Sequence, residues 1–192
     1  MKKYNKSQET QRRIMDIAIK LFSEDNYEDI SVSKICSLAG VSTGSFYHQI
    51  GSKENLIKIT YEAHIEESAK LLEKMTDSST IEKIKFVIDR YLIHALAYGY
   101  KYYRYFFKLG LDNKLPLRVD NSVTMHSYIK SLTELGVANN EFSKKYSSSH
   151  ICRAILSVAR GTVYEWCLAE GKFDLKASLS LYLDILLKEF EK

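Results

Sequence analysis

A serine flanked by glycines lies in the stretch AGVSTGSFYHQIGSKENL, residues 39–56, and its spacing could do chemistry. Gly40, Ser42 and Gly44 match the G-x-S-x-G pattern, in which a sharp turn exposes the nucleophilic serine of a hydrolase. That turn needs a buried β-strand before the serine, and its catalytic partners need βαβ units after it. The preceding residues, SVSKICSLA, have helical spacing, and no strand pattern follows. We therefore reject a serine hydrolase.

Other enzyme chemistry also lacks an anchor in the sequence. The glycines do not have the G-x-x-x-x-G-K-[ST] spacing of a phosphate-binding loop. The three cysteines, Cys36, Cys152 and Cys167, are too few and too far apart for a disulfide framework. We expect them to be reduced and buried, with a redox switch as the alternative. The sequence thus predicts no enzyme, no cofactor and no metal site.

The same stretch has a second interpretation, which is DNA recognition. A short helix, a tight turn at Gly40 and a helix capped by Ser42 make a helix-turn-helix, whose second helix offers its first residues to base edges. Small residues at its start permit close approach to DNA, and the polar side chains after them reach phosphates or bases. An ordinary solvated surface is the alternative. The residues expected to contact DNA are Ser33, Thr43, Gly44, Ser45, Tyr47, His48 and Lys53.

The charge of the chain is concentrated at its N-terminus. The 192 residues have a formal net charge of +4, and residues 1–13 account for all of it through Lys2, Lys3, Lys6, Arg12 and Arg13 against Glu9. A basic arm on a neutral body suggests contact with a polyanion at one end, although a solvated tail has the same composition. No apolar run is long enough to cross a bilayer, and the charged start is unlike a signal peptide. We expect a cytoplasmic protein.

Helical spacing dominates the rest of the chain. Apolar residues recur every three or four positions from Thr10, and a 45% hydrophobic fraction with a single proline favours long helices over strands. Ser52, the Ser79 capping box and Asp174 mark helix starts, and the polar stretch at 75–80 separates two regions. Gly99, Gly110 and Pro116 punctuate the middle. The prediction is all-α with about nine helices, among them one over about 120–135 ending at Gly136, one from 147 that stops at Gly171, and a last one after Asp174.

Residues 8–60 resemble the N-terminal domain of the TetR family of bacterial transcriptional regulators. The match covers an amphipathic first helix ending in Leu-Phe and the core that follows it. Cys36, Leu38 and Ile50 depart from the usual residues, but all three are apolar replacements expected to affect packing. The positions that correspond to the family core, these three included, are Ser31, Val32, Ile35, Cys36, Leu38 to Ser42, Gly44, Phe46, Tyr47, Ile50, Ser52 to Glu54 and Leu56.

The resemblance implies a function and an assembly. Such proteins are homodimers joined by their last two long helices, bind a pseudo-palindromic operator, and are commonly repressors released by a small-molecule inducer. It implies a DNA-binding domain over 1–52 and a ligand-binding and dimerisation domain over 53–192. The helix starting at Lys53 is the expected lever between the two.

An aromatic segment marks where a ligand would bind. Residues 91–107, YLIHALAYGYKYYRYFF, contain six of the 14 tyrosines and two phenylalanines. Tyrosines at helical spacing commonly form core, but so many together suggest an apolar pocket with a few polar groups. The residues expected to line it are His94, Tyr98, Tyr103, Phe107, His126 and Trp166.

A different class of function stays open at this point: an all-α protein-interaction module whose helix-turn-helix is only scaffold. Sequence-preferring, salt-dependent DNA binding, weakened by substitution of Tyr47 or Lys53, separates the two classes. The sequence does not decide whether the ligand releases or promotes DNA binding.

Overall fold

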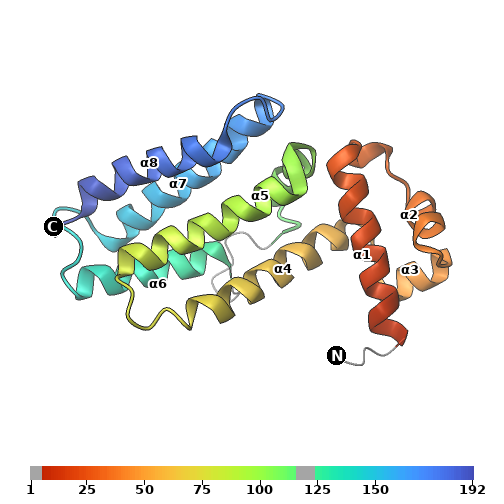
Figure 1. The fold of residues 1–192 in the computed structure, drawn as a ribbon, viewed down its shortest axis with the longest axis horizontal. Helices are drawn as coiled ribbons and strands as arrows, with labels where there is room; N and C mark the ends of the chain where they lie inside the picture. The colour runs from red at the N-terminus through yellow and green to blue at the C-terminus, as the bar shows by residue number, and fades with distance from the viewer. Residues whose placement is uncertain (1–5, 116–123) are drawn as a thin grey trace.

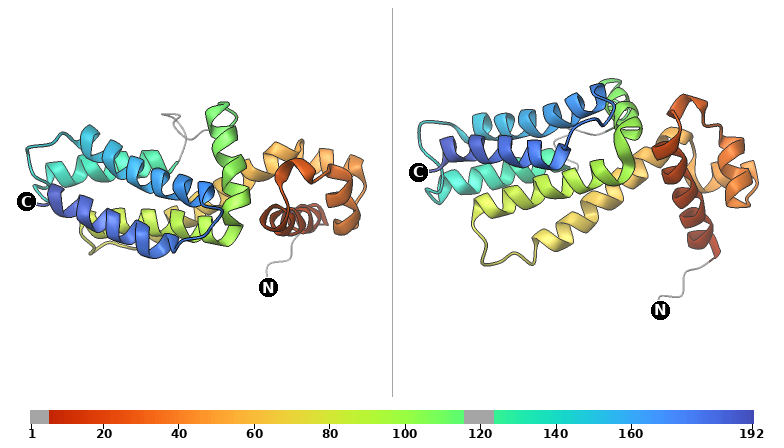
Figure 2. Two further views of the ribbon diagram at one scale, coloured as in Figure 1. Left: turned by 90° about the horizontal axis from the view of Figure 1, so that it is seen from above. Right: turned by 45° about the horizontal axis from the view of Figure 1, so that its top comes forward.

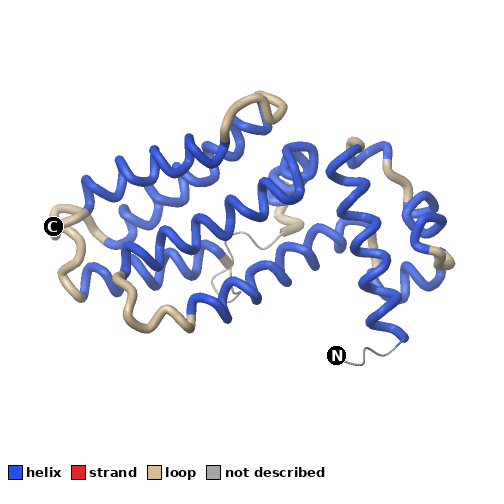
Figure 3. Tube along the Cα trace, viewed as in Figure 1, coloured by secondary structure: helices blue, strands red, loops and turns tan. Residues whose placement is uncertain are grey.

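The computed structural model describes residues 6–115 and 124–192, which contain eight α-helices and one 3-10 helix (Figure 1). Figure 3 shows helices joined by loops; the described residues form no β-strand, only an isolated bridge between Phe142 and Glu191. The all-α prediction is confirmed. The elements are α1 Lys6–Glu24, η1 Tyr27–Asp29, α2 Val32–Ala39, α3 Thr43–Ile50, α4 Lys53–Leu72, α5 Thr80–Leu111, α6 Met125–Ala138, α7 Ser148–Leu168 and α8 Leu175–Phe190.

Side-chain caps start the helices where the sequence predicted them. Ser42 accepts a hydrogen bond from the Ser45 amide at 3.1 Å, and Ser52 accepts one from the Asn55 amide at 3.2 Å. Ser79 has the full capping box with Glu82. Each cap satisfies an amide that a helix start leaves without a partner, which is why these boundaries can be read locally.

Helix α5 differs from the prediction because it continues through Gly99 with a kink. Gly99 has φ 79° and ψ 167°, which is not helical, so α5 consists of two helical segments, 80–98 and 100–111. The second segment stands across the first in the left view of Figure 2. Counting the two segments separately accounts for the expectation of about nine helices. Gly110 does not interrupt the second segment.

Two other glycines have roles that the sequence did not reveal. Gly136 was expected to end a helix, but it lies inside α6, where a Cβ atom would approach the Phe142 ring to 2.5 Å. Close packing, not a turn, therefore requires this glycine. Helix α7 ends at Leu168, before Gly171, which adopts φ 77° in the following turn. Pro116 and the predicted helix start at Asp120 lie outside the described residues.

The helices form two groups that α4 connects. Helices α1, α2 and α3 pack together around buried residues that include Ile14, Phe22, Ile35 and Phe46. From this group α4 runs into a bundle with α5–α8, and the C-terminus lies at the far end of that bundle (Figure 1). The predicted boundary at 52/53 falls in the short link between α3 and α4.

Candidate nucleic-acid interface and ligand cleft

The turn between α2 and α3 depends on a left-handed glycine. Gly40 has φ 63° and ψ 41°, and the Val41 amide donates to the Cys36 carbonyl at 3.0 Å, which closes the end of α2. Ser42 then caps α3 through its Oγ atom. With a helix before it and a capping role, Ser42 does not have the geometry of a nucleophile on a strand-to-helix turn.

Helix α3 presents a polar face to solvent. Phe46 and Ile50 are buried, whereas Thr43, Tyr47 and His48 are exposed. At the exposed Gly44 a Cβ atom would meet nothing closer than Ser42 Oγ at 3.9 Å, so the protein itself does not require a glycine there. The face is therefore open to an approaching partner. Of the other two predicted contacts near it, Ser33 is exposed on α2 and Ser45 is partly buried.

Lys53 has a different environment from the expected phosphate contact. Its Nζ atom donates to the carbonyls of Tyr27 at 2.6 Å and Ile30 at 2.7 Å, and it lies 3.8 Å from the centroid of the Tyr27 ring. Burial lowers the pKa of this partly buried amine. The geometry favours a structural tie between α4 and the η1 turn. The partners are more than twenty residues away in sequence, so no local pattern could reveal them.

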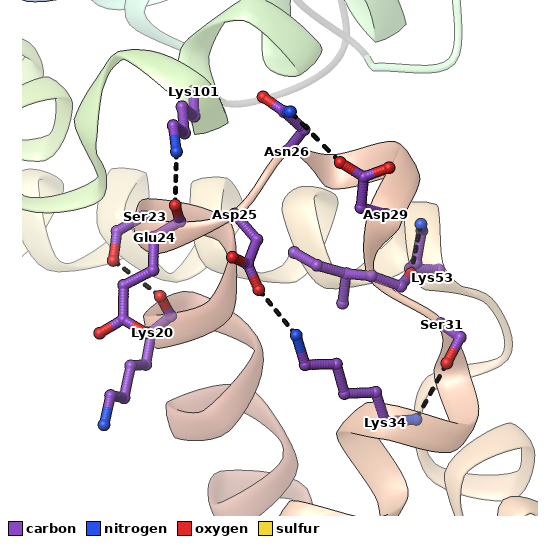
Figure 4. Close-up of polar contacts among 11 residues, drawn as sticks. Lys20, Ser23, Glu24, Asp25, Asn26, Asp29, Ser31, Lys34, Lys53 and Lys101 are labelled. Carbon is purple, nitrogen blue, oxygen red and sulfur yellow. Dashed lines mark hydrogen bonds and ion pairs between the residues drawn. The ribbon is translucent and has the colours of Figure 1, made fainter.

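Two polar contacts hold α2 and α3 against α1. Lys34 on α2 forms an ion pair with Asp25, just after α1, at 2.7 Å (Figure 4). The hydrogen bond and charge of Lys34 lower the pKa of the Asp25 carboxyl. At the other end of α1, Ser7 donates to Gln49 at 3.0 Å. The contacts orient the helix-turn-helix on α1. Lys2 and Lys3 of the predicted basic arm lie outside the described residues.

The second segment of α5 contacts the end of α1 and the η1 turn directly. Lys101 donates to the Glu24 carbonyl at the end of α1 (Figure 4), and Lys108 pairs with Glu28 at 3.2 Å. Tyr105 stacks on Tyr27 with a centroid distance of 3.4 Å. Segment 100–111 is therefore a second connection between the two groups of helices, beside α4.

The opposite face of segment 100–111 borders a large open cleft, which we call the outer cleft. Its volume is about 820 Å³, and its walls combine aromatic side chains with the cationic side chains of Lys58, Lys114 and Arg160. This combination suits a ligand with an apolar body and an anionic group. The lining residues are Lys58, Tyr61, Tyr91, Phe106, Phe107, Gly110, Leu111, Asn113, Lys114, Leu115, Met125, Arg160, Gly161 and Tyr164.

A small buried chamber, which we call the inner cavity, lies beside the outer cleft. Its volume is about 20 Å³, and Tyr61, Tyr91 and Met125 line both spaces. In the inner cavity His94 Nδ1 and the Tyr103 hydroxyl lie 2.7 Å apart. Burial, followed by the charges of His64 and Arg90, lowers the pKa of His94 to about 3, so this imidazole is neutral at physiological pH.

The structure does not bring the six predicted ligand residues into one pocket. His94 and Tyr103 line the inner cavity and Phe107 lines the outer cleft. Tyr98 stacks on the His94 ring with a centroid distance of 4.2 Å but lines neither space. His126 lines a separate cleft between α6 and α7. Trp166 is buried and packs edge-on against Tyr100.

The residues that line both the inner cavity and the outer cleft were not among the predicted ligand residues. Tyr61, Tyr91 and Met125 come from α4, α5 and α6, and only the packing of these helices brings them together. Tyr91 was visible as part of the aromatic segment, but its spacing was equally typical of core.

All three cysteines are buried and unpaired, as expected. Within 6–115 and 124–192 no cluster of His, Cys, Asp and Glu side chains is arranged to hold a metal ion. The same ranges contain no helix with the length and apolar character needed to span a membrane.

The N-terminal helices match a known protein family. Residues 14–58 match the family described as bacterial regulatory proteins, tetR family. The fatty acid metabolism regulator protein of Bacillus subtilis (strain 168) is 24% identical over 183 residues, which is 91% of this chain and 92% of that protein. The HTH-type transcriptional regulator UidR of Escherichia coli (strain K12) is 38% identical over 52 residues, 27% of this chain and 26% of that protein.

The whole fold also has a solved counterpart. The crystal structure of the transcriptional regulator FadR from Bacillus subtilis in complex with stearoyl-CoA superposes with a TM-score of 0.63 at 21% identity, covering 94% of this chain and 99% of that one. Together with the family match and these relatives, the helix-turn-helix identifies a DNA-binding transcriptional regulator, not an enzyme. The match over residues 14–58 identifies the N-terminal helices as a TetR-family domain. The alternative of a protein-interaction module without specific DNA binding is not favoured.

Proposed function

We propose that this regulator is a repressor that binds operator DNA through the exposed face of α3 and is released by a small-molecule ligand. Thr43, Gly44, Tyr47 and His48 form that face, with Ser33 and Ser45 at its edge. The small residues at the start of α3 suit close approach to base edges, and Tyr47 and His48 supply polar tips for phosphates or bases. Lys53 has a supporting role, because its ammonium is bound to carbonyl oxygens.

The proposed assembly is a homodimer through α7 and α8. Large apolar side chains are exposed along these helices, and the exposed Ser157 and Gly161 permit close helix approach. Two-fold symmetry would place two α3 helices in successive major grooves, with half-site centres roughly 34 to 36 Å apart. The exposed apolar residues outside the outer cleft are Leu168, Leu181, Tyr182 and Ile185.

The proposed ligand is a molecule with a long apolar chain and an anionic head, of which a long-chain acyl-CoA is the example. The outer cleft supports this because Phe106, Phe107 and Tyr164 supply apolar walls, whereas Lys58, Lys114 and Arg160 supply positive charge. A relative that covers most of the chain is a fatty acid metabolism regulator, and a similar Bacillus subtilis structure contains stearoyl-CoA.

The position of segment 100–111 between the outer cleft and η1 is the main support for this proposal. Phe106, Phe107 and Leu111 on one face line the outer cleft, while Tyr105 and Lys108 on the other contact η1. A ligand that moves this segment changes the support of the DNA-binding helices without touching them. The ligand lowers DNA affinity only if it binds more tightly to the arrangement that fits DNA less well.

DNA binding measured by fluorescence anisotropy tests the function. The full-length protein is titrated into a labelled duplex from upstream of its own gene, at several salt concentrations, with and without stearoyl-CoA. We expect specific binding that weakens steeply with salt, and an affinity at least about tenfold lower with stearoyl-CoA but not with free CoA. No preference over a scrambled duplex would overturn the DNA assignment. An affinity that stearoyl-CoA leaves unchanged would overturn the ligand assignment.

The predicted domain division and location belong to the same proposal. A boundary at 52/53 separates the three DNA-binding helices from the bundle that supplies the outer cleft and the exposed apolar faces. A regulator of this kind works on the chromosome, so we place it in the cytoplasm.

A further inference from the structure

Two residues that line the inner cavity each have a buried polar atom without a hydrogen-bonding partner among the described residues. The two atoms are Nε2 of His94 and the hydroxyl oxygen of Tyr91. His94 is 2% exposed and Tyr91 is 6% exposed. A buried polar group without a partner typically costs about 1–3 kcal/mol, so two around one cavity indicate a place where a partner belongs.

The hydrogen bond at Nδ1 of His94 determines whether Nε2, the other ring nitrogen, is a donor or an acceptor. The Tyr103 hydroxyl is buried, and its only hydrogen bond given by the described residues is the one to His94 Nδ1 at 2.7 Å. If Tyr103 donates this bond, its proton is satisfied and the neutral imidazole has its own proton on Nε2. His94 Nε2–H and the Tyr91 hydroxyl are then both available donors on residues that line the cavity. Two donors around one cavity favour an acceptor oxygen.

The size and position of the inner cavity limit how that oxygen arrives. A volume of about 20 Å³ holds little more than one oxygen-sized group. The neighbouring space is the outer cleft, and Tyr61, Tyr91 and Met125 form the wall between them. Met125 is a flexible side chain, and its displacement would join the two spaces. Only the end of a ligand seated in the outer cleft fits this entry.

The charge around the inner cavity favours a neutral group. Arg90 is the cationic residue in its lining, and its guanidinium pairs with Glu67 at 2.7 Å and donates to Ser68 at 3.2 Å. His94 is neutral and buried. A carboxylate here would be desolvated without an uncommitted counter-ion, at a high cost.

We propose that the inner cavity is a recognition site for an uncharged, hydrogen-bond-accepting oxygen at the far end of the ligand chain, held by His94 Nε2–H and the Tyr91 hydroxyl. The natural ligand is then an acyl compound oxygenated at its chain end and not a plain saturated acyl chain. This inference rests on the proposed function, since it places the rest of the ligand in the outer cleft.

Matched pairs of acyl-CoA probes test the site. Decanoyl-, dodecanoyl-, tetradecanoyl- and hexadecanoyl-CoA are each compared with the ω-hydroxy derivative of the same length, by calorimetry on the full-length protein. Four lengths cover the distance between the two spaces. For at least one length we expect the ω-hydroxy compound to bind roughly 3- to 10-fold more tightly, the range given by one net hydrogen bond. The ω-carboxy derivative of that length should bind more weakly than the hydroxyl.

Three variants test whether the preference for the ω-hydroxy probe arises in the inner cavity. In His94→Phe and, separately, Tyr91→Phe, the affinity ratio between the two probes of the preferred pair should fall towards one. Two independent variants keep the test usable if one of them fails to fold. Tyr98→Phe is the matched control, because Tyr98 stacks on His94 but lines neither space, and it should keep the ratio.

The outcomes of these experiments distinguish a failure of the oxygen site from a failure of the proposed acyl-CoA ligand. Equal affinities in every pair would overturn the oxygen site while leaving acyl-CoA binding intact. A ratio that both cavity variants preserve would also overturn it, and tighter binding of the ω-carboxy probe would overturn the requirement for a neutral group. If no probe binds, the proposed ligand class itself fails.

Discussion

The predicted DNA-contact region contains two kinds of residue. Some make contacts that stabilise the fold, and others are exposed to solvent. Ser42 caps α3 and Lys53 ties α4 to the η1 turn, so both act within the protein. Gly44 and Tyr47 are exposed, although the Tyr47 ring also packs edge-on against Phe46 with a centroid distance of 5.5 Å. The second group is where we expect recognition of DNA.

Gly44→Ala separates folding from DNA binding. Alanine favours a helix over glycine by about 0.5–1 kcal/mol, and the added Cβ meets only Ser42 Oγ at 3.9 Å, so the free energy of unfolding should rise or stay constant. DNA affinity should fall several-fold if α3 approaches the groove closely here. Urea unfolding and anisotropy measure the two effects. Unchanged DNA affinity would remove Gly44 from the interface.

His94 makes stability depend on pH. Its pKa is about 3 in the folded protein and 6.5 when exposed, so between these values the unfolded state binds the proton and the folded state does not. Stability should therefore fall as the pH drops through this window, by about 2 kcal/mol from His94 alone between about pH 7 and about pH 5. Nearby His64, with its pKa also lowered by burial, adds to the loss, and Arg90 lies beside both.

Urea unfolding of the wild type and His94→Phe at both pH values checks this dependence. The variant should lose stability less steeply with acid. Parallel curves for the two proteins would mean that His94 is protonated in the folded state or exposed to solvent.

At the scale of elements, segment 100–111 of α5 is a second connection, beside α4, between the outer cleft and the N-terminal helices. We expected α4 to be the lever, and α4 does join the two groups of helices. Yet Lys101, Tyr105 and Lys108 attach the second segment of α5 to the end of α1 and to η1. Coupling through α4 and coupling through segment 100–111 predict different effects of substitutions in that segment.

Lys108→Ala combined with Tyr105→Ala should uncouple the sites. Ligand affinity should stay close to the wild-type value because both side chains lie on the face away from the outer cleft, while the effect of stearoyl-CoA on DNA affinity should shrink several-fold. Lys145→Ala is the control, since it breaks a similar exposed ion pair, with Glu189 at 3.1 Å, elsewhere in the bundle. A full ligand response in the double variant would favour α4 as the lever.

The kink at Gly99 positions this segment. Its φ of 79° with ψ of 167° is a conformation that essentially only glycine adopts, although a Cβ atom would meet nothing within 4 Å. Gly99→Ala should therefore cost about 1–3 kcal/mol through backbone strain and not through a clash. Thermal or urea unfolding measures the loss. A neutral substitution would show that the backbone relaxes, most simply by straightening α5.

At the scale of the whole molecule, the exposed apolar faces of α7 and α8 indicate a partner. Ile185 is 62% exposed and Leu181 57% exposed on α8, and Leu168 is 61% exposed on α7. A second copy of the chain would bury them and set the spacing of the two α3 helices. Operator binding then depends on residues far from the DNA.

Ile185→Glu should disrupt the dimer because a charge enters an apolar contact. Sedimentation velocity should show a monomer, and operator affinity should fall by more than about tenfold, because one half-site then binds without the other. Leu135→Glu is the control, an exposed leucine on α6. If the Ile185 variant sediments as the wild type does, the dimer uses another surface.

What the sequence determined by itself was local. The helical spacing, the Ser42, Ser52, Ser79 and Asp174 caps and the left-handed Gly40 all depend on residues within about four positions of one another, so the all-α fold and the helix-turn-helix could be predicted. Resemblance of the same stretch to a family supplied the function.

Only the tertiary structure decided the contacts between distant segments. It turned Lys53 toward the carbonyls of Tyr27 and Ile30, made Gly136 a packing position against Phe142, and separated His94 from Phe107 into two adjoining spaces. It also placed segment 100–111 between the outer cleft and η1. The reason is physical: helical periodicity shows which face of a helix is buried, but which helices meet there depends on the packing of the whole chain.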